Sequence, residues 1–124
     1  MIYGIGIDLI EVARVKKSIE KIGGFKEKIF TSKEISYCES KSRKFEHFAA
    51  RFAAKEAFFK AIGTGWRNGL AFNEIEVLND KLGKPEMRFY GKTDDLYRIN
   101  KFKRVNVSIS HIKETASAFV IIET

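Results

Sequence analysis

The 124-residue chain contains a single cysteine and a single proline. Cys38 has no second thiol in the chain, so an internal disulfide is excluded. With one proline, no low-complexity run and 44% hydrophobic residues, the composition indicates a compact globular protein, not a disordered or fibrous one. There is no cationic-then-apolar leader and no apolar run of about 18 residues, so we expect a cytoplasmic protein in a reducing compartment.

Acidic residues are also in short supply, because 16 Asp and Glu face 23 Lys and Arg and leave a net charge of +7. Such a charge attracts an acidic protein, nucleic acid, anionic lipid or polyphosphate about equally well. Basic side chains gather near the N-terminus, among them Arg14, Lys17 and Lys21. Taken alone, this cluster is best interpreted as a solvated helix surface, with a docking site as the alternative.

The length fits one domain spanning residues 1–124. A chain of this size buries a real core but encloses a deep cleft only with difficulty. We therefore consider a site shared between subunits plausible.

Hydrophobic periodicity predicts a mixed sequence of strands and helices. The expected elements are a strand at 2–9, a helix at 11–22, a helix from 31 or 32 to 40, a long helix from 43 or 44 to 63, strands at 74–78 and 86–90, a short helix at 93–101, and strands at 104–110 and 115–122. The last strand is nearly all apolar, so we expect it to be central. The order predicts an α+β fold with an antiparallel sheet packed against a long buried helix.

The long helix carries the segment RFAAKEAFFKAIGTG, in which four charged residues interrupt an otherwise apolar stretch. Arg51 lies one turn from Lys55, and Glu56 lies one turn from Lys60. At 100° per residue Glu56 points towards a phenylalanine face, where a carboxylate needs a cation, a metal or several donors. A simple exposed ion pair with Lys60 is the alternative interpretation.

Asp8 ends the first strand and shares a face with Gly4 and Gly6, which leave room for a close neighbour. Considered alone, Asp8 with Glu11 three residues later resembles a helix cap. If Asp8 instead converges with Glu56, the two carboxylates suit Mg²⁺, which binds through one or two carboxylates and completes its shell with substrate phosphate oxygens.

His111 follows two serines of the predicted strand, Ser108 and Ser110, and the three suggest an anion or ribose contact. A surface histidine at a hairpin is the alternative. A serine-hydrolase site is disfavoured, because adjacent strand residues point to opposite faces and no nucleophile elbow surrounds Ser110. His47 has no supporting neighbours in the sequence.

The segment Gly63, Thr64, Gly65 follows the long helix. Its backbone amides could face a phosphate, although a helix C-terminus has the wrong dipole for that purpose. A glycine stop signal is the better interpretation on geometry alone.

Three motifs stand in order along the chain: GIGIDLIEV from residue 4, RFAAKEAFFKAIGTG from residue 51 and VSISHIKETA from residue 107. Together they closely resemble the holo-[acyl-carrier-protein] synthase family, the short bacterial-type branch of the 4'-phosphopantetheinyl transferases. The resemblance covers essentially the full length and includes Phe30-Thr31 with Glu34, and Gly83-Lys84-Pro85.

This resemblance implies transfer of the 4'-phosphopantetheine arm of coenzyme A to a serine of apo acyl carrier protein, in fatty acid biosynthesis. By matching positions, Asp8 and Glu56 are expected to hold Mg²⁺. Lys60 is expected to face the same phosphates and to stabilise or protonate the leaving group. Either Glu56 or a metal-bound water takes the serine proton.

The resemblance also implies contacts to the nucleotide part of coenzyme A from His111 with Ser108 or Ser110. Further candidates for these contacts are Arg51, Lys55 and the loop of Gly63, Thr64 and Gly65. It implies that the acidic carrier protein docks near Arg14 and Lys17 or Lys21, and that the protein forms homotrimers with three sites at subunit interfaces.

Two other classes of function fit the sequence less well. A basic RNA-binding module is suggested by the charge, but most phenylalanines fall at core spacing and leave no obvious stacking surface. A different magnesium-dependent phosphotransferase would be expected to have a glycine-rich phosphate loop before a helix, which the sequence lacks.

Overall fold

The computed structural model describes residues 1–63 and 69–124. Its elements are β1 (Ile2–Glu11), α1 (Val12–Glu20), α2 (Phe25–Ile29), α3 (Ser32–Glu39), α4 (Lys44–Ile62), the 3-10 helix η1 (Phe72–Glu74), β2 (Ile75–Asn79), β3 (Pro85–Phe89), α5 (Gly91–Ile99), β4 (Arg104–His111) and β5 (Thr115–Glu123). The α+β class is confirmed. The short elements α2 and η1 were not predicted from the sequence.

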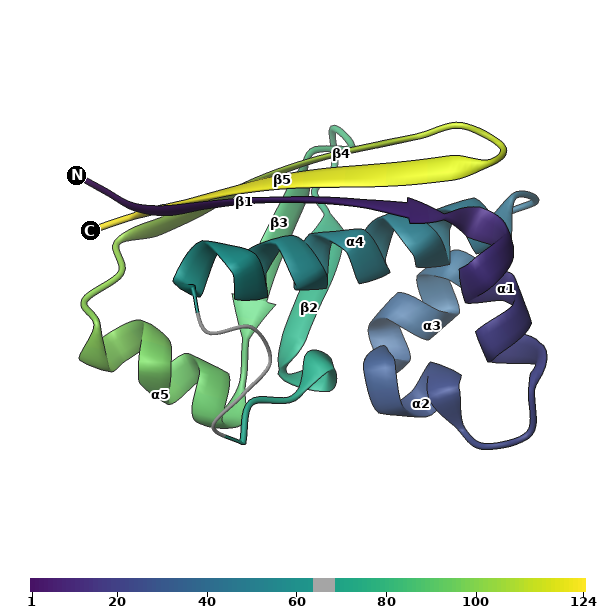
Figure 1. Ribbon diagram of the computed structural model, residues 1–124, viewed down its shortest axis with the longest axis horizontal. Helices are drawn as coiled ribbons and strands as arrows, with labels where there is room; N and C mark the ends of the chain where they lie inside the picture. Colours follow the sequence, from purple (N-terminus) through teal and green to yellow (C-terminus); the bar gives the residue numbers. More distant parts are fainter. Residues whose placement is uncertain (64–68) are drawn as a thin grey trace.

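Two antiparallel sheets lie on different sides of α4 (Figure 1). One has the strand order β1-β5-β4, so β5 is central as predicted, and the other is the β2-β3 hairpin. Helices α1 to α3 gather near the N-terminal end of α4, and α5 lies near its other end. Both chain ends meet at one edge, where the Met1 amino group donates to the Thr124 carbonyl at 2.9 Å.

The approach of β1 to α4 depends on two glycines. A Cβ atom at Gly4 would overlap the carbonyl oxygen of Ala61, and one at Gly6 would overlap that of Ala57. Alanines on α4 and glycines on β1 therefore let two backbones pack directly against each other. This contact brings the next residue on that strand face, Asp8, against the helix.

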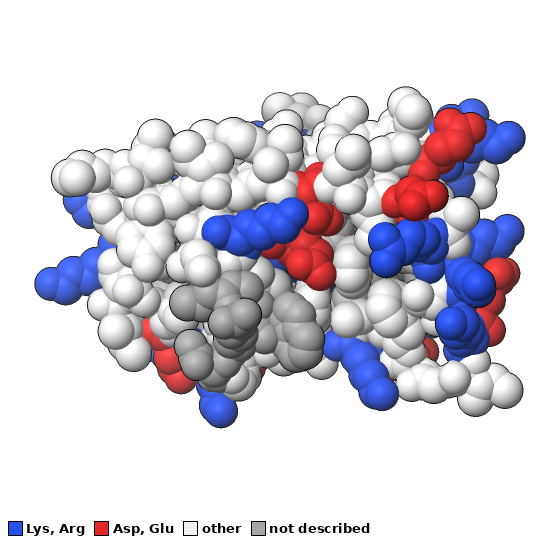
Figure 2. Space-filling view, in the orientation of Figure 1, with Lys and Arg blue, Asp and Glu red and all other residues white. Residues whose placement is uncertain are grey.

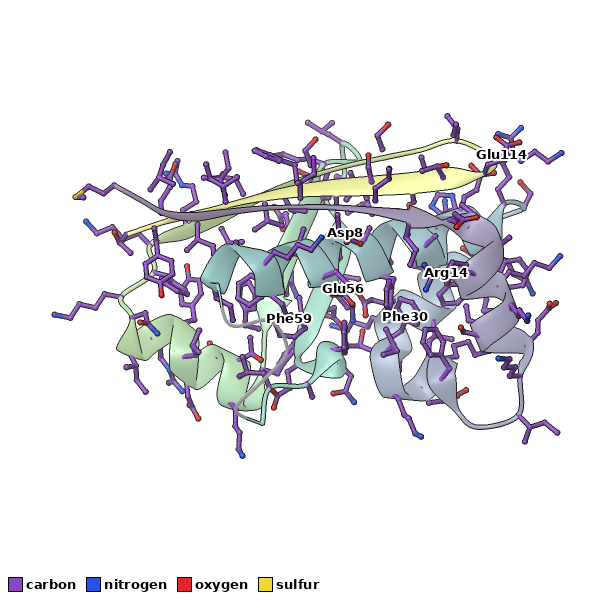
Figure 3. All side chains as sticks on the ribbon, viewed as in Figure 1. Asp8, Arg14, Phe30, Glu56, Phe59 and Glu114 are labelled. Carbon is purple, nitrogen blue, oxygen red and sulfur yellow. The ribbon has the colours of Figure 1, made fainter. Side chains whose placement is uncertain are left out.

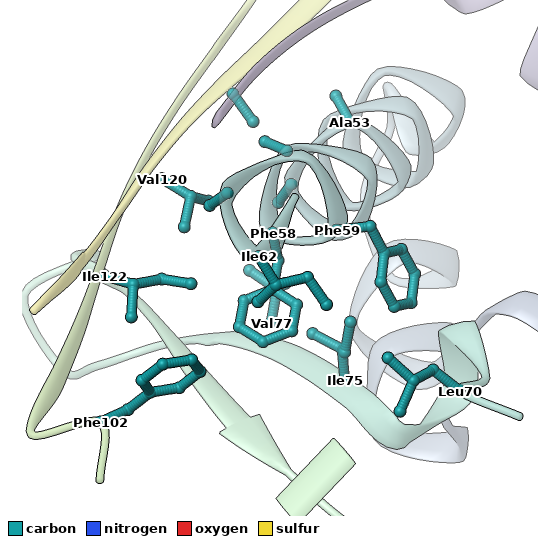
Figure 4. Close-up of a cluster of buried hydrophobic side chains, with 14 residues drawn as sticks. Ala53, Phe58, Phe59, Ile62, Leu70, Ile75, Val77, Phe102, Val120 and Ile122 are labelled. Atoms are coloured by element: carbon teal, nitrogen blue, oxygen red, sulfur yellow. The ribbon is translucent and has the colours of Figure 1, made fainter. Parts of the chain in front are cut away.

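The hydrophobic core surrounds α4 on both sides (Figure 4). Helix α4 contributes Phe58 and Phe59, the large sheet contributes Val120 and Ile122, and the hairpin contributes Ile75 among others. A second cluster forms where α1 to α3 pack on the first half of α4. No helix of the described residues is long and apolar enough to cross a membrane.

The start of α1 corrects the interpretation of Asp8 as a helix cap. Strand β1 continues to Glu11 and α1 begins at Val12, so Asp8 lies inside the strand, away from the helix N-terminus. By contrast, Thr31 forms the capping box of α3 with Glu34. The same sequence pattern, a polar residue followed by Glu three positions later, is thus a helix cap at Thr31 and part of a strand at Asp8.

Candidate active site

Asp8 of β1 and two residues of α4 form one cluster on the surface (Figure 3). The Lys60 ammonium donates to Asp8 Oδ1 at 3.0 Å and to the Ile7 carbonyl at 3.0 Å. Burial raises the pKa of Glu56 and the negative charge of Asp8 raises it further, while Lys60 opposes both effects. Two carboxylates from distant parts of the chain thus share one site with a lysine.

The cluster is open to solvent on the face shown in Figure 2. Acidic atoms lie at the middle of that face with a basic side chain beside them, in the region where Figure 3 labels Asp8 and Glu56. Asp8 lies on the same face of β1 as Gly6, and Glu56 lies on α4. Because Gly6 has no side chain, this face of β1 can approach α4 closely. The glycines of β1 are therefore part of how the site is built.

The donor set suits a hard divalent cation. Two carboxylates are what Mg²⁺ takes from a protein when substrate phosphates complete its shell. Burial and, after it, the negative charge of Asp8 raise the pKa of Glu56, and a bound cation would stabilise its ionised form. Within the described parts of the chain, no group of three or more His, Cys, Asp or Glu could hold a metal.

Arg51 and Lys55, suggested above as nucleotide contacts, point into the protein. Arg51 donates through Nε to the Val77 carbonyl at 3.1 Å and through Nη2 to Asn79 Oδ1 at 2.6 Å, and its guanidinium stacks on Tyr37. Neither cation has surface left for a ligand, since both side chains are buried. Arg51 and Lys55 are therefore not part of the proposed site.

The partner of Lys55 is Glu34, a residue that sequence reasoning placed only in a motif. Lys55 Nζ lies 2.6 Å from Glu34 Oε1 and donates to the carbonyls of Ile29 and Phe72. Glu34 also accepts from the Val77 amide at 2.8 Å. The capping box was a local signal for Glu34, but nothing local indicates the contacts to α4 and β2.

The structure separates His111 from the two serines. Ser108 and Ser110 are exposed on the outer face of the large sheet, whereas His111 faces α4 and its Nδ1 lies 2.9 Å from Glu46 Oε1. Glu46 and Glu56 are ten residues apart, which is about 15 Å along a helix. His111 is therefore not beside the carboxylate cluster of its own chain.

Gly63 ends α4 in the left-handed conformation, with φ of 87°, and its amide donates to the Phe59 and Lys60 carbonyls. The stop-signal interpretation holds for this residue. Thr64 and Gly65 lie outside the described residues.

The basic surface of α1 is hollowed on its flanks. One cavity of about 260 Å³ is lined by Lys21, Lys28 and the Phe25 ring, among others. A smaller one of about 100 Å³ lies beneath Arg14, with Phe25 and Phe52 in its walls. Cations beside apolar hollows have the chemistry that complements acidic and apolar groups together.

The outer face of the large sheet is strongly apolar along β1. Ile5, Ile7 and Leu9 are exposed there, and Phe119 of β5 is exposed opposite Ile7. Large apolar patches of this kind are less common on monomeric proteins than isolated exposed apolar residues.

The chain belongs to the 4'-phosphopantetheinyl transferase superfamily, whose family model matches residues 4–116. It is similar over nearly its whole length to proteins named holo-[acyl-carrier-protein] synthase. One from a Geobacter species is 44% identical over 124 residues and is covered over 99% of both chains.

Solved structures agree with this assignment. The holo-[acyl-carrier-protein] synthase of Neisseria meningitidis matches with a TM-score of 0.92 at 37% identity, over 100% of both chains. That of Bacillus anthracis, in complex with CoA (3',5'-ADP), matches with a TM-score of 0.83 at 41% identity, over 100% of this chain and 98% of that one.

Proposed function

We propose that this protein transfers the 4'-phosphopantetheine group of coenzyme A to a serine of apo acyl carrier protein. The serine oxygen forms a new bond to phosphorus, the bond from that phosphorus to the departing oxygen breaks, and adenosine 3',5'-bisphosphate leaves. The meeting of Asp8 and Glu56 across β1 and α4, in a chain of this family, carries the proposal.

Asp8 and Glu56 would hold Mg²⁺, which supplies positive charge for the diphosphate of coenzyme A. Glu56 is the candidate of this chain to accept the serine proton. In the metal-free protein, burial raises the pKa of Glu56. Asp8 contributes to this raised pKa through its negative charge.

Lys60 would neutralise the leaving phosphate or donate a proton to it. Its ammonium is half exposed while it contacts Asp8 Oδ1, so it can reach a ligand in front of the cluster. We expect Lys60→Ala to lower kcat by about 10-fold to 100-fold with less effect on the KM for coenzyme A, as for a charge that acts mainly in the transition state. An unchanged kcat would remove Lys60 from the chemistry.

The carrier protein is proposed to dock on α1, near Arg14 and Lys17 or Lys21. The cavities beside these cations offer apolar walls next to positive charge. Binding of this kind weakens with salt. We expect Arg14→Ala to raise the KM for carrier protein but not that for coenzyme A, and salt to raise the KM for carrier protein less in this variant than in the wild type; equal effects of Arg14→Ala on both KM values would contradict docking on α1.

A homotrimer with sites at subunit interfaces is proposed from two observations. The outer sheet face with Ile5, Ile7 and Leu9 would be covered by other copies of the chain. His111 stands apart from Asp8 within one chain, so it can complete a neighbour's site only across an interface. Light scattering should give three times the chain mass, and Ile7→Lys should lower that mass; a wild-type monomer would overturn this part.

The decisive experiment is intact-mass analysis of apo acyl carrier protein after incubation with the protein, coenzyme A and magnesium. We expect a mass gain of one phosphopantetheine on the carrier, and none when magnesium is chelated. A carrier whose active serine is replaced by alanine is the matched control. No gain under any metal condition would refute the proposed reaction.

A further inference from the structure

The Glu46–His111 pair is not used by the reaction as described so far. Glu46 lies in the first turn of α4, its side chain is 8% exposed, and its Oε1 is 2.9 Å from Nδ1 of His111. The other charged neighbour is Arg43, whose Nε is 3.9 Å from Glu46 Oε2 and whose side chain is 75% exposed. Such a distant, exposed contact contributes little, so His111 is the principal partner of Glu46.

The chemistry of this contact determines which ring nitrogen of His111 is available. An ionised carboxylate only accepts hydrogen bonds, so Nδ1 must carry the hydrogen. The remaining nitrogen, Nε2, is then the atom that can meet a ligand. Without this contact the ring of a residue at the end of β4 has broad rotational freedom about χ2.

A second histidine holds the ring from another side. The ring centroids of His47 and His111 lie 5.0 Å apart at 63°, and His47 in turn meets Tyr37 edge-on at 5.8 Å. Burial lowers the pKa of His47, and positive charge on His111 would lower it further. The His47 ring therefore packs against the His111 ring, and Glu46 supplies the carboxylate that contacts His111.

We propose that Glu46 is a positioning residue for coenzyme A binding: its carboxylate fixes the tautomer and orientation of His111 so that Nε2 is presented to the nucleotide part of the ligand. The inference rests on the proposed function, because it takes coenzyme A as the ligand. The competing explanation is a purely structural tie between α4 and β4, which would stabilise the fold without affecting ligand affinity.

Steady-state kinetics distinguish the two explanations. Glu46→Gln keeps an acceptor for Nδ1 but removes its charge, so we expect the KM for coenzyme A to rise about 5-fold to 10-fold, the difference between a charge-assisted and a neutral hydrogen bond, while kcat changes less than about 3-fold. Glu39→Gln is the control, because Glu39, the last residue of α3, makes exposed ion pairs with Lys26 of α2 and Lys44 of α4, whereas Glu46 is the carboxylate that contacts His111. It should leave both constants unchanged.

A double-mutant cycle tests whether Glu46 acts through His111. If it does, Glu46→Gln should raise the KM no further in a His111→Ala background, since the group that it positions is already gone. Independent, multiplying effects of the two substitutions on the KM would overturn the proposal. So would a Glu46→Gln variant that loses thermal stability but keeps the wild-type KM.

The tautomer of His111 can be measured by NMR spectroscopy without any enzyme assay. Ring ¹⁵N shifts of His111 in the full protein should report a protonated Nδ1, and Glu46→Ala should shift that population towards the other tautomer. Binding of adenosine 3',5'-bisphosphate, measured by calorimetry, should weaken in the same variant. If the wild type neither transfers phosphopantetheine nor binds this nucleotide, the proposed function fails; if it does both and Glu46→Ala matches it, only the positioning role fails.

Discussion

Helix α4 carries two lysine–carboxylate pairs that differ in almost every physical respect. Lys55 lies 2.6 Å from Glu34, with both side chains 0% exposed. Lys60 lies 3.0 Å from Asp8, with side chains 52% and 14% exposed. The two lysines are only five residues apart in the sequence. Similar residue types on one helix thus have opposite environments.

The difference indicates which pair is structural and which is reactive. The Lys55 ammonium has three protein acceptors and Glu34 has two backbone donors, so both charges are satisfied within the chain. At the open pair, Lys60 contacts Asp8 while Glu56 keeps a raised pKa beside it. Unrelieved negative charge at the surface is what binds a cation, whereas a satisfied buried pair holds elements together.

Removing a carboxylate from the open site should have the largest effect of all. We expect Asp8→Asn and Glu56→Gln each to lower the transferase rate by at least about 100-fold, as for loss of a metal ligand or a general base. The substitutions are close in shape, so the folded structure should persist. Rates come from the mass assay at saturating carrier protein and excess magnesium.

The matched control for that experiment is Glu39→Gln, an exposed carboxylate in ordinary surface ion pairs. Its rate and melting temperature should equal those of the wild type. Full activity in either open-site variant at limiting magnesium would remove that carboxylate from the proposed site.

At the buried pair, the expected loss is of stability. Lys55→Met leaves the Glu34 carboxylate buried without its cation, and this should cost about 3–5 kcal/mol in the free energy of unfolding. The double variant Lys55→Met, Glu34→Leu should recover part of that loss, although the Val77 amide is then unpaired. Urea unfolding measures both. A single variant as stable as the wild type would show that the pair is not the tie that its geometry indicates.

Much of the fold follows from local patterns in the sequence. The continuous apolar run predicted β5 as the central strand, and the structure places it between β1 and β4. Alternation on the first strand put Gly4, Gly6 and Asp8 on one face, and that face does pack on α4. For Asp8 on this face the sequence left two interpretations, a helix cap and a partner of Glu56, and local pattern alone did not decide between them.

The remaining features depend on contacts between residues far apart in the sequence. Helical spacing showed that Arg51 and Lys55 lie on one side of α4, but not that α3 and β2 cover that side with Glu34 and the Val77 backbone. The Glu46–His111 contact spans 65 residues. No periodicity within one element reports such a pair, since each member is also compatible with a solvated surface.

Substitutions at Gly4 and Gly6, where β1 packs on α4, should have smaller effects than those at the buried pair. Gly6→Ala would push against the Ala57 carbonyl and Gly4→Ala against the Ala61 carbonyl, each costing about 1–3 kcal/mol of stability. Because Gly6 is nearer to Asp8 in the strand, its variant should lose more activity at equal stability. Equal activity losses from both variants would mean that Asp8 is not sensitive to the distance between β1 and α4.

The smallest expected effect is on the pH dependence of stability, and it comes from Cys38, which is fully buried. Burial raises the pKa of this thiol from 9.0 to about 12, with Arg51 opposing the shift. Above pH 9 the unfolded chain therefore loses a proton that the folded chain keeps, so stability falls as pH rises. From pH 8 to pH 10 this amounts to about 1 kcal/mol.

Lys55 acts with the opposite sign, because burial lowers its pKa and the folded state then gains stability towards high pH. Comparison of the wild type with Cys38→Ala cancels this contribution, since Lys55 is present in both proteins. The unfolding free energy of the wild type should drop between pH 8 and pH 10 by about 1 kcal/mol more than that of the variant. Identical pH dependence would show that the thiol ionises in the folded protein, and hence that water reaches the region around Glu34 and Lys55.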